Sequence, residues 1–453
     1  MSQANQQYYA GNPLNRLSYL RSSPAFLTSA LRSPKARFLA LENLALLCEP
    51  PAKDGARHIA TLGWEDVGHV ISEAENVFKG VSGKDDSEVD GLALLGVEGK
   101  KTVGELSEEE KREYFVNQPA LVFLGVDERS APQSAQSLPL SKPDDNSTLE
   151  THSPYGIPYW ALDVSRFKEL KEKLLAGGEA GKREFADLRA GSQTMPAEEA
   201  AIGAEARSLV DWNTRNKFCP SCARPQRSIW AGFKRQCLPA SPPSPSAPAS
   251  PPCITRRGVH NVQYPRTDPV VIMAVLSPDR EQILLGRQRS WPEKFYSCLA
   301  GFVESGESLE EAVRREVYEE AGVVCDEVGY FASQPWPYPA SLMFGCYAVA
   351  REGQEIRCDL DNELEDARYF TRAQVLAVIE NTQPMQLSRE EVARLDGKEG
   401  ISSASAEGKK DAAKEEALFR MPPSTAIANS LITAWAKGTL YTPTAKSQEG
   451  GKL

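Results

Sequence analysis

Long apolar segments are missing from this 453-residue sequence, in which no run approaches the roughly 18 apolar residues that span a bilayer. The first residues, MSQANQQYYAGNPL, lack the basic and then apolar order of a secretory signal peptide. Basic residues are outnumbered, since 52 Lys and Arg stand against 62 Asp and Glu for a net charge of −10. The sequence therefore predicts an intracellular protein without the broad basic surface of a general nucleic-acid binder, although a local basic pocket is compatible with it.

Histidine is also scarce, and none of the four histidines lies in the acidic motif described below. A histidine general base therefore has no support from a motif. The nine cysteines are not expected to form disulfides inside a cell, so their spacing decides which of them matter. With 41% hydrophobic and 25% charged residues, the composition is that of a globular protein, and the length favours two or three domains.

Apolar patterning predicts strands and helices along most of the chain. Strands are expected at residues 120–126, 160–164, 268–276, 282–286 and 344–349. Helices are expected at residues 197–212, after Pro196, at about 309–321, and at 425–435. Polar or proline-rich stretches at residues 127–154, 238–252 and 395–414 are expected to be loops or insertions. In the C-terminal half, this mixed order of strands and helices predicts an α/β sandwich.

The most informative segment is residues 301–323, GFVESGESLEEAVRREVYEEAGV. Ser308 and Glu311 have the spacing of a capping box, which predicts that a helix begins at Leu309. Gly322 lies where a left-handed residue would end that helix. The sequence therefore defines both ends of the helix, and side chains can be placed around it at about 100° per residue.

Glutamates occur on the side of this helix that is expected to be buried. Glu316 and Glu320 share the arc of the apolar residues, and Glu319 lies at its edge. In the alternative interpretation, such glutamates simply form a solvent-exposed face of the helix. Buried carboxylates instead need a cationic partner, because an isolated buried charge is strongly disfavoured. Clustered oxygen ligands suit Mg²⁺ or Mn²⁺, which also bridge phosphate oxygens.

The same segment resembles the Nudix signature at every fixed position, with Gly301, Glu307 and residues 315–323 at the required spacing. The resemblance implies a Nudix α/β/α sandwich, in which a loop, helix and second loop pack on a mixed sheet. It also implies hydrolysis of a pyrophosphate linkage. Divalent metal ions would neutralise the pyrophosphate and activate the attacking water in an in-line displacement.

By this resemblance, the signature supplies the residues for catalysis, which are Glu307, Arg315, Glu316, Glu319 and Glu320. Arg315 would orient a carboxylate, and Glu307 would support the loop. The Mg²⁺ or Mn²⁺ ligands would be the carbonyl of Ala300 and the carboxylates of Glu316, Glu319, Glu320 and Glu363. Glu363 matches the position of an additional carboxylate in related enzymes. Glu365 and Asp366 lie close to it, and a surface acidic turn is the alternative interpretation.

Ten residues after the signature comes a proline-rich aromatic segment, SQPWPYPAS, at residues 333–341, which is expected to form a rigid loop. Its prolines restrict the backbone, and Trp336 and Tyr338 offer flat faces to a base or nicotinamide ring. A rigid aromatic corner of the core is the alternative. The segment resembles the substrate-recognition motif of NADH pyrophosphatases. The resemblance implies that substrate is contacted by Tyr264, Gln334, Pro335, Trp336, Pro337, Tyr338, Pro339, Ala340, Ser341 and Ala428.

The cysteine pattern Cys219-x2-Cys222-x14-Cys237, with Cys253 beyond it, provides four thiols for a structural zinc ion. The first three match the zinc ribbon of NADH pyrophosphatases. Cys253 departs from that pattern, because a proline-rich insertion separates it from Cys237, whereas the second pair is normally close-spaced. Such an insertion can be looped out at modest entropic cost, so we expect one Zn²⁺ per chain.

These observations predict five parts of the chain. They are an N-terminal NADH pyrophosphatase-like α+β domain with a Nudix-like fold (1–165), connecting helices (166–212), a zinc ribbon with the insertion (213–262), a catalytic Nudix domain (263–440) and a flexible tail (441–453). The predicted reaction is hydrolysis of NADH and NAD⁺ to a nicotinamide mononucleotide and AMP. The family also allows removal of NAD caps from RNA by the same cleavage.

An alternative function is a non-catalytic module that binds nucleotide or uses the zinc ribbon to hold a partner. The intact set of signature glutamates argues against it, because a binding module has no physical need for that cluster. The family resemblance implies a homodimer, and the lack of a long apolar run predicts no membrane association. It also implies a peroxisomal location, for which the terminus Gly451-Lys452-Leu453 resembles the Ser-Lys-Leu signal. The cytoplasm is the alternative.

Overall fold

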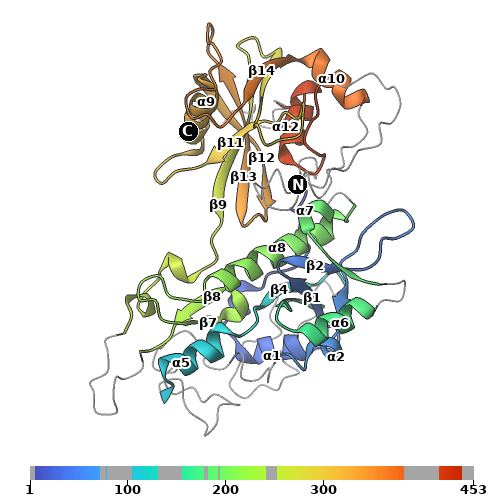
Figure 1. Ribbon diagram of the computed structural model, residues 1–453, viewed down its shortest axis with the longest axis vertical. Coiled ribbons are helices and arrows are strands. Elements are labelled where there is room, and N and C mark those ends of the chain that lie inside the picture. Colours follow the sequence, from blue (N-terminus) through green and yellow to red (C-terminus); the bar gives the residue numbers. More distant parts are fainter. Residues whose placement is uncertain are drawn as a thin grey trace, which may run out of the picture. The chain divides into compact units, whose positions relative to one another are not determined.

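A computed structural model describes residues 6–71, 78, 105–130, 156–177, 182–191, 194–240, 252–381 and 418–440. The chain forms two compact units, which are described separately (Figure 1). The first unit comprises Met1–Ala10, Asp268–Trp336 and Ser341–Leu453, and the second comprises Gly11–Thr267 and Pro337–Ala340. Within the described residues, no helix is both long and apolar enough to cross a membrane.

The first unit is built on a six-stranded mixed sheet with the order β12-β13-β9-β10-β14, and β11 also pairs with β9. Only β9 and β13 run parallel to each other. The strands are β9 (Asp268–Leu276), β10 (Gln282–Arg287), β11 (Leu299–Phe302), β12 (Cys325–Trp336), β13 (Ser341–Ala350) and β14 (Asp366–Thr371). The helices are α9 (Leu309–Ala321), α10 (Arg372–Asn381) and α12 (Ile427–Ala436).

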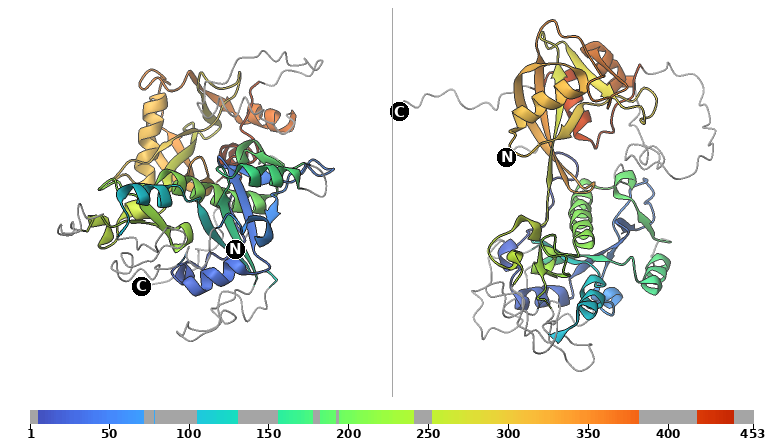
Figure 2. Two further views of the ribbon diagram at one scale, coloured as in Figure 1. Left: turned by 60° about the horizontal axis from the view of Figure 1, so that its bottom comes forward. Right: turned by 60° about the vertical axis from the view of Figure 1, so that its left-hand side comes forward.

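Strand β9 carries apolar side chains on both of its faces, as a central strand buried on two sides requires. Val271, Met273 and Val275 share a core with helix α9. The alternate residues Ile272 and Ala274 pack in a second core with helix α12. Helices α9 and α12 therefore cover opposite faces of the sheet (Figures 1 and 2), and the predicted α/β/α sandwich is confirmed.

The second unit contains another six-stranded mixed sheet with the order β4-β5-β1-β2-β6, and β3 also pairs with β1. The strands are β1 (Arg37–Glu42), β2 (Ala45–Cys48), β3 (Thr61–Leu62), β4 (Leu121–Asp127), β5 (Ile157–Asp163) and β6 (Glu184–Ala186). The helices are α1 (Pro24–Arg32), α2 (Trp64–Val67), α5 (Glu108–Lys111), α6 (Lys168–Ala176), α7 (Leu188–Gly191) and α8 (Ala197–Arg215). A separate two-stranded ribbon consists of β7 (Gln226–Ile229) and β8 (Lys234–Cys237).

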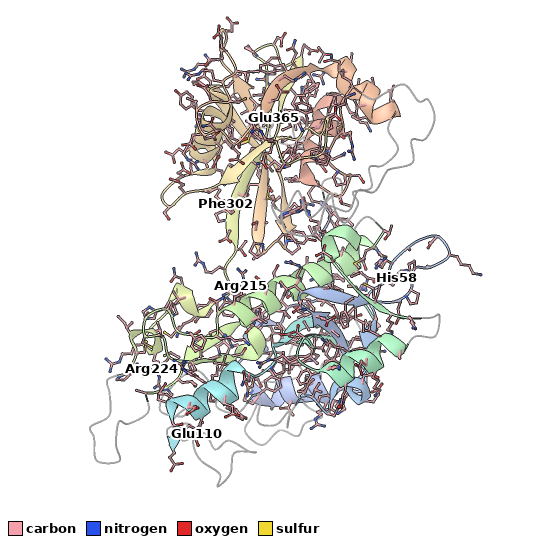
Figure 3. The ribbon with its side chains drawn as sticks, in the orientation of Figure 1. His58, Glu110, Arg215, Arg224, Phe302 and Glu365 are labelled. Atoms are coloured by element: carbon pink, nitrogen blue, oxygen red, sulfur yellow. The ribbon has the colours of Figure 1, made fainter. Side chains whose placement is uncertain are left out.

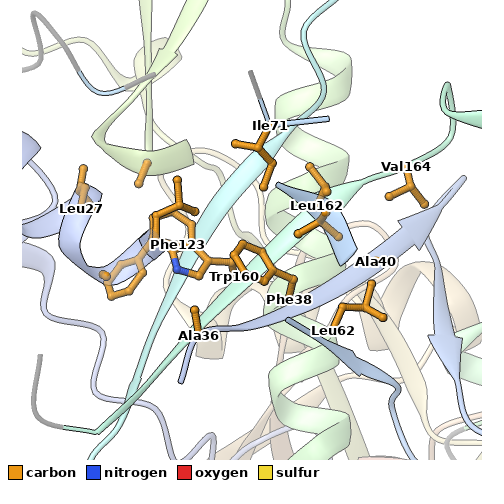
Figure 4. Packing of buried hydrophobic residues seen from close by; sticks show 14 of the residues in the cluster. Leu27, Ala36, Phe38, Ala40, Leu62, Ile71, Phe123, Trp160, Leu162 and Val164 are labelled. Carbon is orange, nitrogen blue, oxygen red and sulfur yellow. The ribbon is translucent and has the colours of Figure 1, made fainter. Parts of the chain in front are cut away.

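Large aromatic side chains fill the core of the second unit. Phe123 and Trp160, from neighbouring strands, have ring centroids 5.1 Å apart, and Phe38 and Leu27 are buried in the same cluster (Figure 4). These residues come from β4, β5, β1 and α1, so one core joins the sheet to the first helix. The unit thus has the mixed helix and strand content predicted for it.

The predicted elements are found, and several extend further than expected. Helix α8 continues to Arg215, and β13 begins at Ser341 rather than at residue 344. The largest difference concerns residues 333–341, which were expected to form a loop. Ser333 to Trp336 instead belong to β12, and Trp336 pairs with Ser341, so only residues 337–340 form the turn of a hairpin. Of the predicted loops, residues 131–154 of the first, residues 241–251 of the second and all of 395–414 lie outside the described residues, as does the C-terminal tripeptide.

Candidate active site

Helix α9 begins and ends where the sequence predicts. The Ser308 hydroxyl accepts a hydrogen bond from the Glu311 amide at 3.3 Å, and the Glu311 carboxylate accepts one from the Ser308 amide at 2.7 Å. Gly322 ends the helix with φ of 67°, a conformation that costs glycine little. These caps determine the helical phase, so that Val317 and Glu320 are buried together.

The guanidinium group of Arg315 holds three carboxylates of the signature. It donates to both oxygens of Glu307 at 2.7 and 2.9 Å, to Glu316 at 2.8 Å and to Glu319 at 3.0 Å. It also donates to the Phe302 carbonyl at 2.8 Å, which joins the helix to strand β11. Arg315 therefore orients two of the predicted metal ligands, because its fork of donors reaches several acceptors at once.

Glu307 is fixed by a second contact, because its carboxylate accepts a hydrogen bond from the Glu304 amide at 2.9 Å. The hydrogen bonds from Arg315 and from this amide lower the pKa of Glu307 to about 2. Glu307 is therefore ionised throughout the working pH range. It holds the loop before the helix and the Arg315 guanidinium together, in agreement with the supporting role that the Nudix resemblance implies.

The predicted metal ligands differ in their exposure. Glu320 is only 2% exposed, whereas the side chains of Glu316 and Glu319 are 13% and 48% exposed. Burial, followed by repulsion from the carboxylates of Glu363 and Glu316, raises the pKa of Glu320 to about 9. The Ala300 amide donates to Glu320 at 3.2 Å, which brings this carboxylate to strand β11 next to the predicted carbonyl ligand.

This arrangement has the chemistry of a divalent cation site. Without a cation, Glu320 would hold a proton at neutral pH, and burial also raises the pKa of Glu316. A hard cation would allow both carboxylates to ionise and would offset their repulsion. Among the described residues, however, no three of these carboxylates converge as closely as the four thiols described below, because Arg315 holds Glu316 and Glu319.

The structure distinguishes Glu363 from its acidic neighbours. The Glu363 carboxylate accepts a hydrogen bond from Gln288 at 2.7 Å and contributes to the raised pKa of Glu320. Glu365, labelled in Figure 3, pairs with Arg287, and Asp366 accepts hydrogen bonds from Tyr296 and Arg368. Glu363 is therefore the carboxylate of this turn that repels Glu320 most strongly, ahead of Asp361.

Within residues 333–341, the side chain of Gln334 is fully buried. Its amide donates to the carbonyls of Tyr8 and Thr425 at 3.0 and 2.9 Å and accepts from the Ile427 amide at 2.8 Å. Gln334 thus caps the N-terminus of α12 instead of facing solvent, and its burial does not fit the expected contact with substrate. Ser341 is also buried, at 8% exposure.

The two aromatic residues of this segment have different surroundings. Trp336 is half-buried in the first unit and meets the ring of Tyr9 edge-on, with centroids 6.0 Å apart. Tyr338, in the second unit, lies 4.7 Å from the guanidinium group of Arg207, which also donates to the Pro337 carbonyl. Each ring thus has protein contacts but is not fully buried, so the geometry does not decide between a rigid corner and a substrate-binding surface.

The remaining predicted substrate residues lie at the start of α12 and near the ribbon. Ala428 is buried in the first turn of α12, and its carbonyl accepts from the Cys298 thiol at 3.9 Å. Tyr264 belongs to the second unit, where its ring centroid lies 5.9 Å from that of Trp230. Pro335 and Ala340 are half-buried, and Pro339 is exposed.

The four cysteines of the predicted zinc site come together in the second unit. The sulfur atoms of Cys219, Cys222, Cys237 and Cys253 all lie within 4.8 Å of one another. The Cys219 and Cys253 sulfurs are 3.8 Å apart, close to the roughly 3.8 Å separation of thiolates around tetrahedral zinc. The structure thus brings Cys253 to the other three thiols in spite of the proline-rich insertion, and the donor set fits zinc.

Sequence reasoning missed three residues at these sites. Gln288 holds Glu363, and Arg207 holds the turn at residues 337–340. Phe302, which follows the signature glycine, is 61% exposed and is labelled in Figure 3. Only Phe302 had a signal in the sequence, because a large apolar residue beside a predicted site is unusual at a surface. The contacts of Gln288 and Arg207 depend on long-range folding.

Comparison with known families agrees with this geometry. Residues 266–392 match the NUDIX domain, and residues 35–212 match the NADH pyrophosphatase-like rudimentary NUDIX domain. The fold and the glutamate helix thus define the class, a Nudix hydrolase. The chain belongs to the Nudix hydrolase family, in the branch that joins a NADH pyrophosphatase-like domain to a catalytic Nudix domain. Members of this family use divalent metal ions.

Its relatives include a NAD-capped RNA hydrolase of Schizosaccharomyces pombe, which is 34% identical over 96% of this chain and 93% of that protein. The human NAD-capped RNA hydrolase NUDT12 is 44% identical over 53% of this chain, which spans only 42% of that protein's length. The human mitochondrial NAD(P)H pyrophosphatase NUDT13 is 33% identical over 56% of this chain and 60% of that protein.

Proposed function

We propose that this enzyme hydrolyses the pyrophosphate bond of NADH and NAD⁺, giving a nicotinamide mononucleotide and AMP, and removes NAD caps from RNA by the same cleavage. The observation that carries the proposal is the Arg315 cluster on α9, next to the buried Glu320. The relatives named as NAD-capped RNA hydrolases and as an NAD(P)H pyrophosphatase support the choice of substrate.

Glu316, Glu319, Glu320, Glu363 and the carbonyl of Ala300 are the proposed ligands of Mg²⁺ or Mn²⁺. When bound, the ions neutralise the pyrophosphate and lower the pKa of the attacking water. Arg315 keeps Glu316 and Glu319 oriented, and Glu307 keeps Arg315 in place. A glutamate of the same helix is proposed as the base that receives the proton of water, since no histidine belongs to the signature.

Trp336 and the first turn of α12, both in the first unit, are proposed to contact the base or the nicotinamide ring of the dinucleotide. The same contact is proposed for Tyr338 and Tyr264 from the family resemblance alone. Half-buried aromatic rings suit this role, because one face packs on protein while another stays available for stacking. Gln334 would act through its cap on α12, which holds the backbone of Ala428 in position.

The four thiols are proposed to bind one structural Zn²⁺. Their convergence within 4.8 Å supports the site, because four thiolates would repel one another without a cation. A homodimer and a peroxisomal location are proposed from the family resemblance and from the Gly-Lys-Leu terminus, which lies outside the described residues.

One experiment tests the proposed substrate. Purified enzyme would be given NADH, NAD⁺, ADP-ribose, diadenosine polyphosphates and NAD-capped RNA side by side, with Mg²⁺ and with Mn²⁺. We expect kcat/KM to be highest for NADH or for NAD-capped RNA, with a nicotinamide mononucleotide as product. A preference for ADP-ribose or for diadenosine polyphosphates would contradict the proposal.

A further inference from the structure

Charge is distributed unevenly along this acidic chain. Residues 212–240 and 252–267, together called the ribbon segment below, contain nine Lys and Arg and not one Asp or Glu. Elsewhere acidic residues prevail, since the whole chain has a net charge of −10. The ribbon segment comprises β7, β8 and all four clustered cysteines. Its charge is therefore strongly positive, with or without a bound zinc ion.

Two of the nine cations are buried and have structural roles. Arg235 is buried and donates to the carbonyls of Asn216 and Asn213, at 2.7 Å each. Arg227 is buried and donates to Gln236 at 2.9 Å. The other seven reach the surface in part or in full, and they are Arg215, Lys217, Arg224, Lys234, Arg256, Arg257 and Arg266. Of these, Arg215 is paired with Asp211, and Lys217 donates to the Val116 carbonyl at 2.8 Å. Arg215 and Arg224 are labelled on the second unit in Figure 3.

Aromatic rings lie among these surface cations. Trp230 and Tyr264 are half-buried, and the Lys234 ammonium group lies 4.7 and 5.6 Å from their ring centroids. Phe218, next to Cys219, is 43% exposed and lies 5.7 Å from the guanidinium carbon of Arg112. The ribbon segment thus combines positive charge with aromatic rings that are partly exposed.

We propose that the ribbon segment binds the single-stranded RNA that follows an NAD cap. Proteins bind single strands with cations that follow the phosphates and with aromatic rings on which bases stack, and the ribbon segment offers both. This inference rests on the proposed function, because it assumes that capped RNA is a substrate. A free dinucleotide has only two phosphates, so these cations add binding energy for the longer substrate alone.

Charge alone would also suit an acidic peptide, but the rings would then have no bases to stack on. RNA is the occupant that uses the cations and the aromatic rings together. The acidic remainder of the chain would repel a polyanion, which favours its binding at the ribbon segment.

The test compares NADH with an NAD-capped single-stranded 20-mer as substrates of the full-length enzyme. Arg257→Glu reverses an exposed charge of the ribbon segment, and Lys35→Glu is the matched reversal of an exposed cation elsewhere in the second unit. We expect Arg257→Glu to raise KM for the capped 20-mer at least about threefold. The slope of log KM against log salt should become shallower by about 0.7, the contribution of one phosphate contact to a single strand.

For NADH, Arg257→Glu should leave kcat and KM unchanged. Lys35→Glu should leave both constants unchanged for NADH and for the capped 20-mer. Trp230→Leu keeps an apolar side chain and should also raise KM for the 20-mer, without changing the salt slope, because stacking releases no counterions. Unchanged KM for the 20-mer in both ribbon variants would overturn the inference. The inference would also be overturned if poly-glutamate competed with the capped 20-mer more strongly than uncapped RNA does, because that result would indicate a protein partner.

A failure of the proposed function is detected separately. If the wild-type enzyme cleaves neither NADH nor the capped 20-mer, that function is wrong. Fluorescence anisotropy with an uncapped labelled 20-mer then still tests whether the ribbon segment binds RNA. Weaker binding by Arg257→Glu than by Lys35→Glu supports the inference, and equal binding overturns it.

Discussion

The carboxylate of Glu316 lies directly against the α-carbon of Gly301. A β-carbon on Gly301 would be 1.9 Å from the carboxyl carbon of Glu316, much closer than atoms can approach. The signature glycine is therefore required by the position of a glutamate fifteen residues later, and not by a left-handed backbone. Strand β11 and helix α9 are close at this point because Gly301 has no side chain, and the Glu316 carboxylate occupies the space that one would fill.

Gly301→Ala should displace Glu316 from Arg315 while leaving the strand intact. We expect kcat to fall at least about tenfold, because small displacements in a catalytic cluster have large effects. The free energy of unfolding should change by about 1 kcal/mol or less, since alanine suits a strand. Steady-state kinetics and urea unfolding measure the two quantities. Gly177→Ala is the control, because its β-carbon meets no atom closer than 3.5 Å.

The raised pKa of Glu320 predicts how the stability of the metal-free protein depends on pH. Folding raises the pKa of Glu320 from its ordinary value of 4.5 to about 9. Between pH 4.5 and pH 9, the folded chain therefore holds a proton on Glu320 that the unfolded chain has lost. Stability without metal should therefore fall as pH rises from about 4.5 to about 9. Glu320→Gln should unfold at a higher urea concentration than wild type at pH 8 in EDTA, and at an equal one at pH 4. If the wild type were more stable than Glu320→Gln at pH 8 in EDTA, this interpretation would be contradicted.

Bound metal should reverse the order of stability of the wild type and Glu320→Gln. Saturating Mg²⁺ should raise the melting temperature of the wild type more than that of Glu320→Gln, because binding to the folded state alone stabilises it. The variant should also lose at least about 100-fold in kcat. Glu310→Gln, on the exposed side of the same helix, is the control that should match wild type in both measurements. Unchanged turnover of Glu320→Gln would disprove the metal assignment.

Gln334→Ala should act mainly on stability. It removes the cap of α12 and leaves the Ile427 amide and the Thr425 carbonyl without this partner, at a cost of about 2 to 3 kcal/mol. Urea unfolding would measure the loss. Gln288→Ala, at the exposed hydrogen bond to Glu363, should cost much less. If Gln334→Ala instead raised KM for NADH without loss of stability, the expected direct contact with substrate would be correct.

Trp336→Ala should weaken NADH relative to ADP-ribose, because only NADH has a nicotinamide ring to stack. Comparison of the two kcat/KM values shows whether the effect is selective. An equal loss with both substrates would mean that Trp336 is a rigid corner packed against Tyr9.

Metal analysis of purified protein should find about one zinc atom per chain, and Cys253→Ser should lower that content. Cys358→Ser, outside the cluster, should leave it unchanged. A wild-type protein without zinc would disprove the site, and full zinc content in Cys253→Ser would exclude this residue as a ligand.

The sequence predicted local features well because local rules determine them. The capping box at Ser308, the left-handed Gly322 and the buried position of Glu320 follow from helical geometry, and all three are found. The hairpin at residues 333–341 was missed because three prolines suggest a loop, whereas the prolines at 335 and 337 lie at the end of β12 and in the turn. Likewise, the capping role of Gln334 was missed because it depends on α12, which lies more than 90 residues later in the chain.

The four thiols have one more consequence. They close the chain between Cys237 and Cys253 into a ring, because the residues on both sides of the insertion meet at one cluster. If zinc occupies it, a molecule cut anywhere within residues 241–251 would still migrate as one particle under native conditions. Such a cut would become visible only after a chelator and denaturant release the metal, so an intact elution profile would not establish an intact polypeptide.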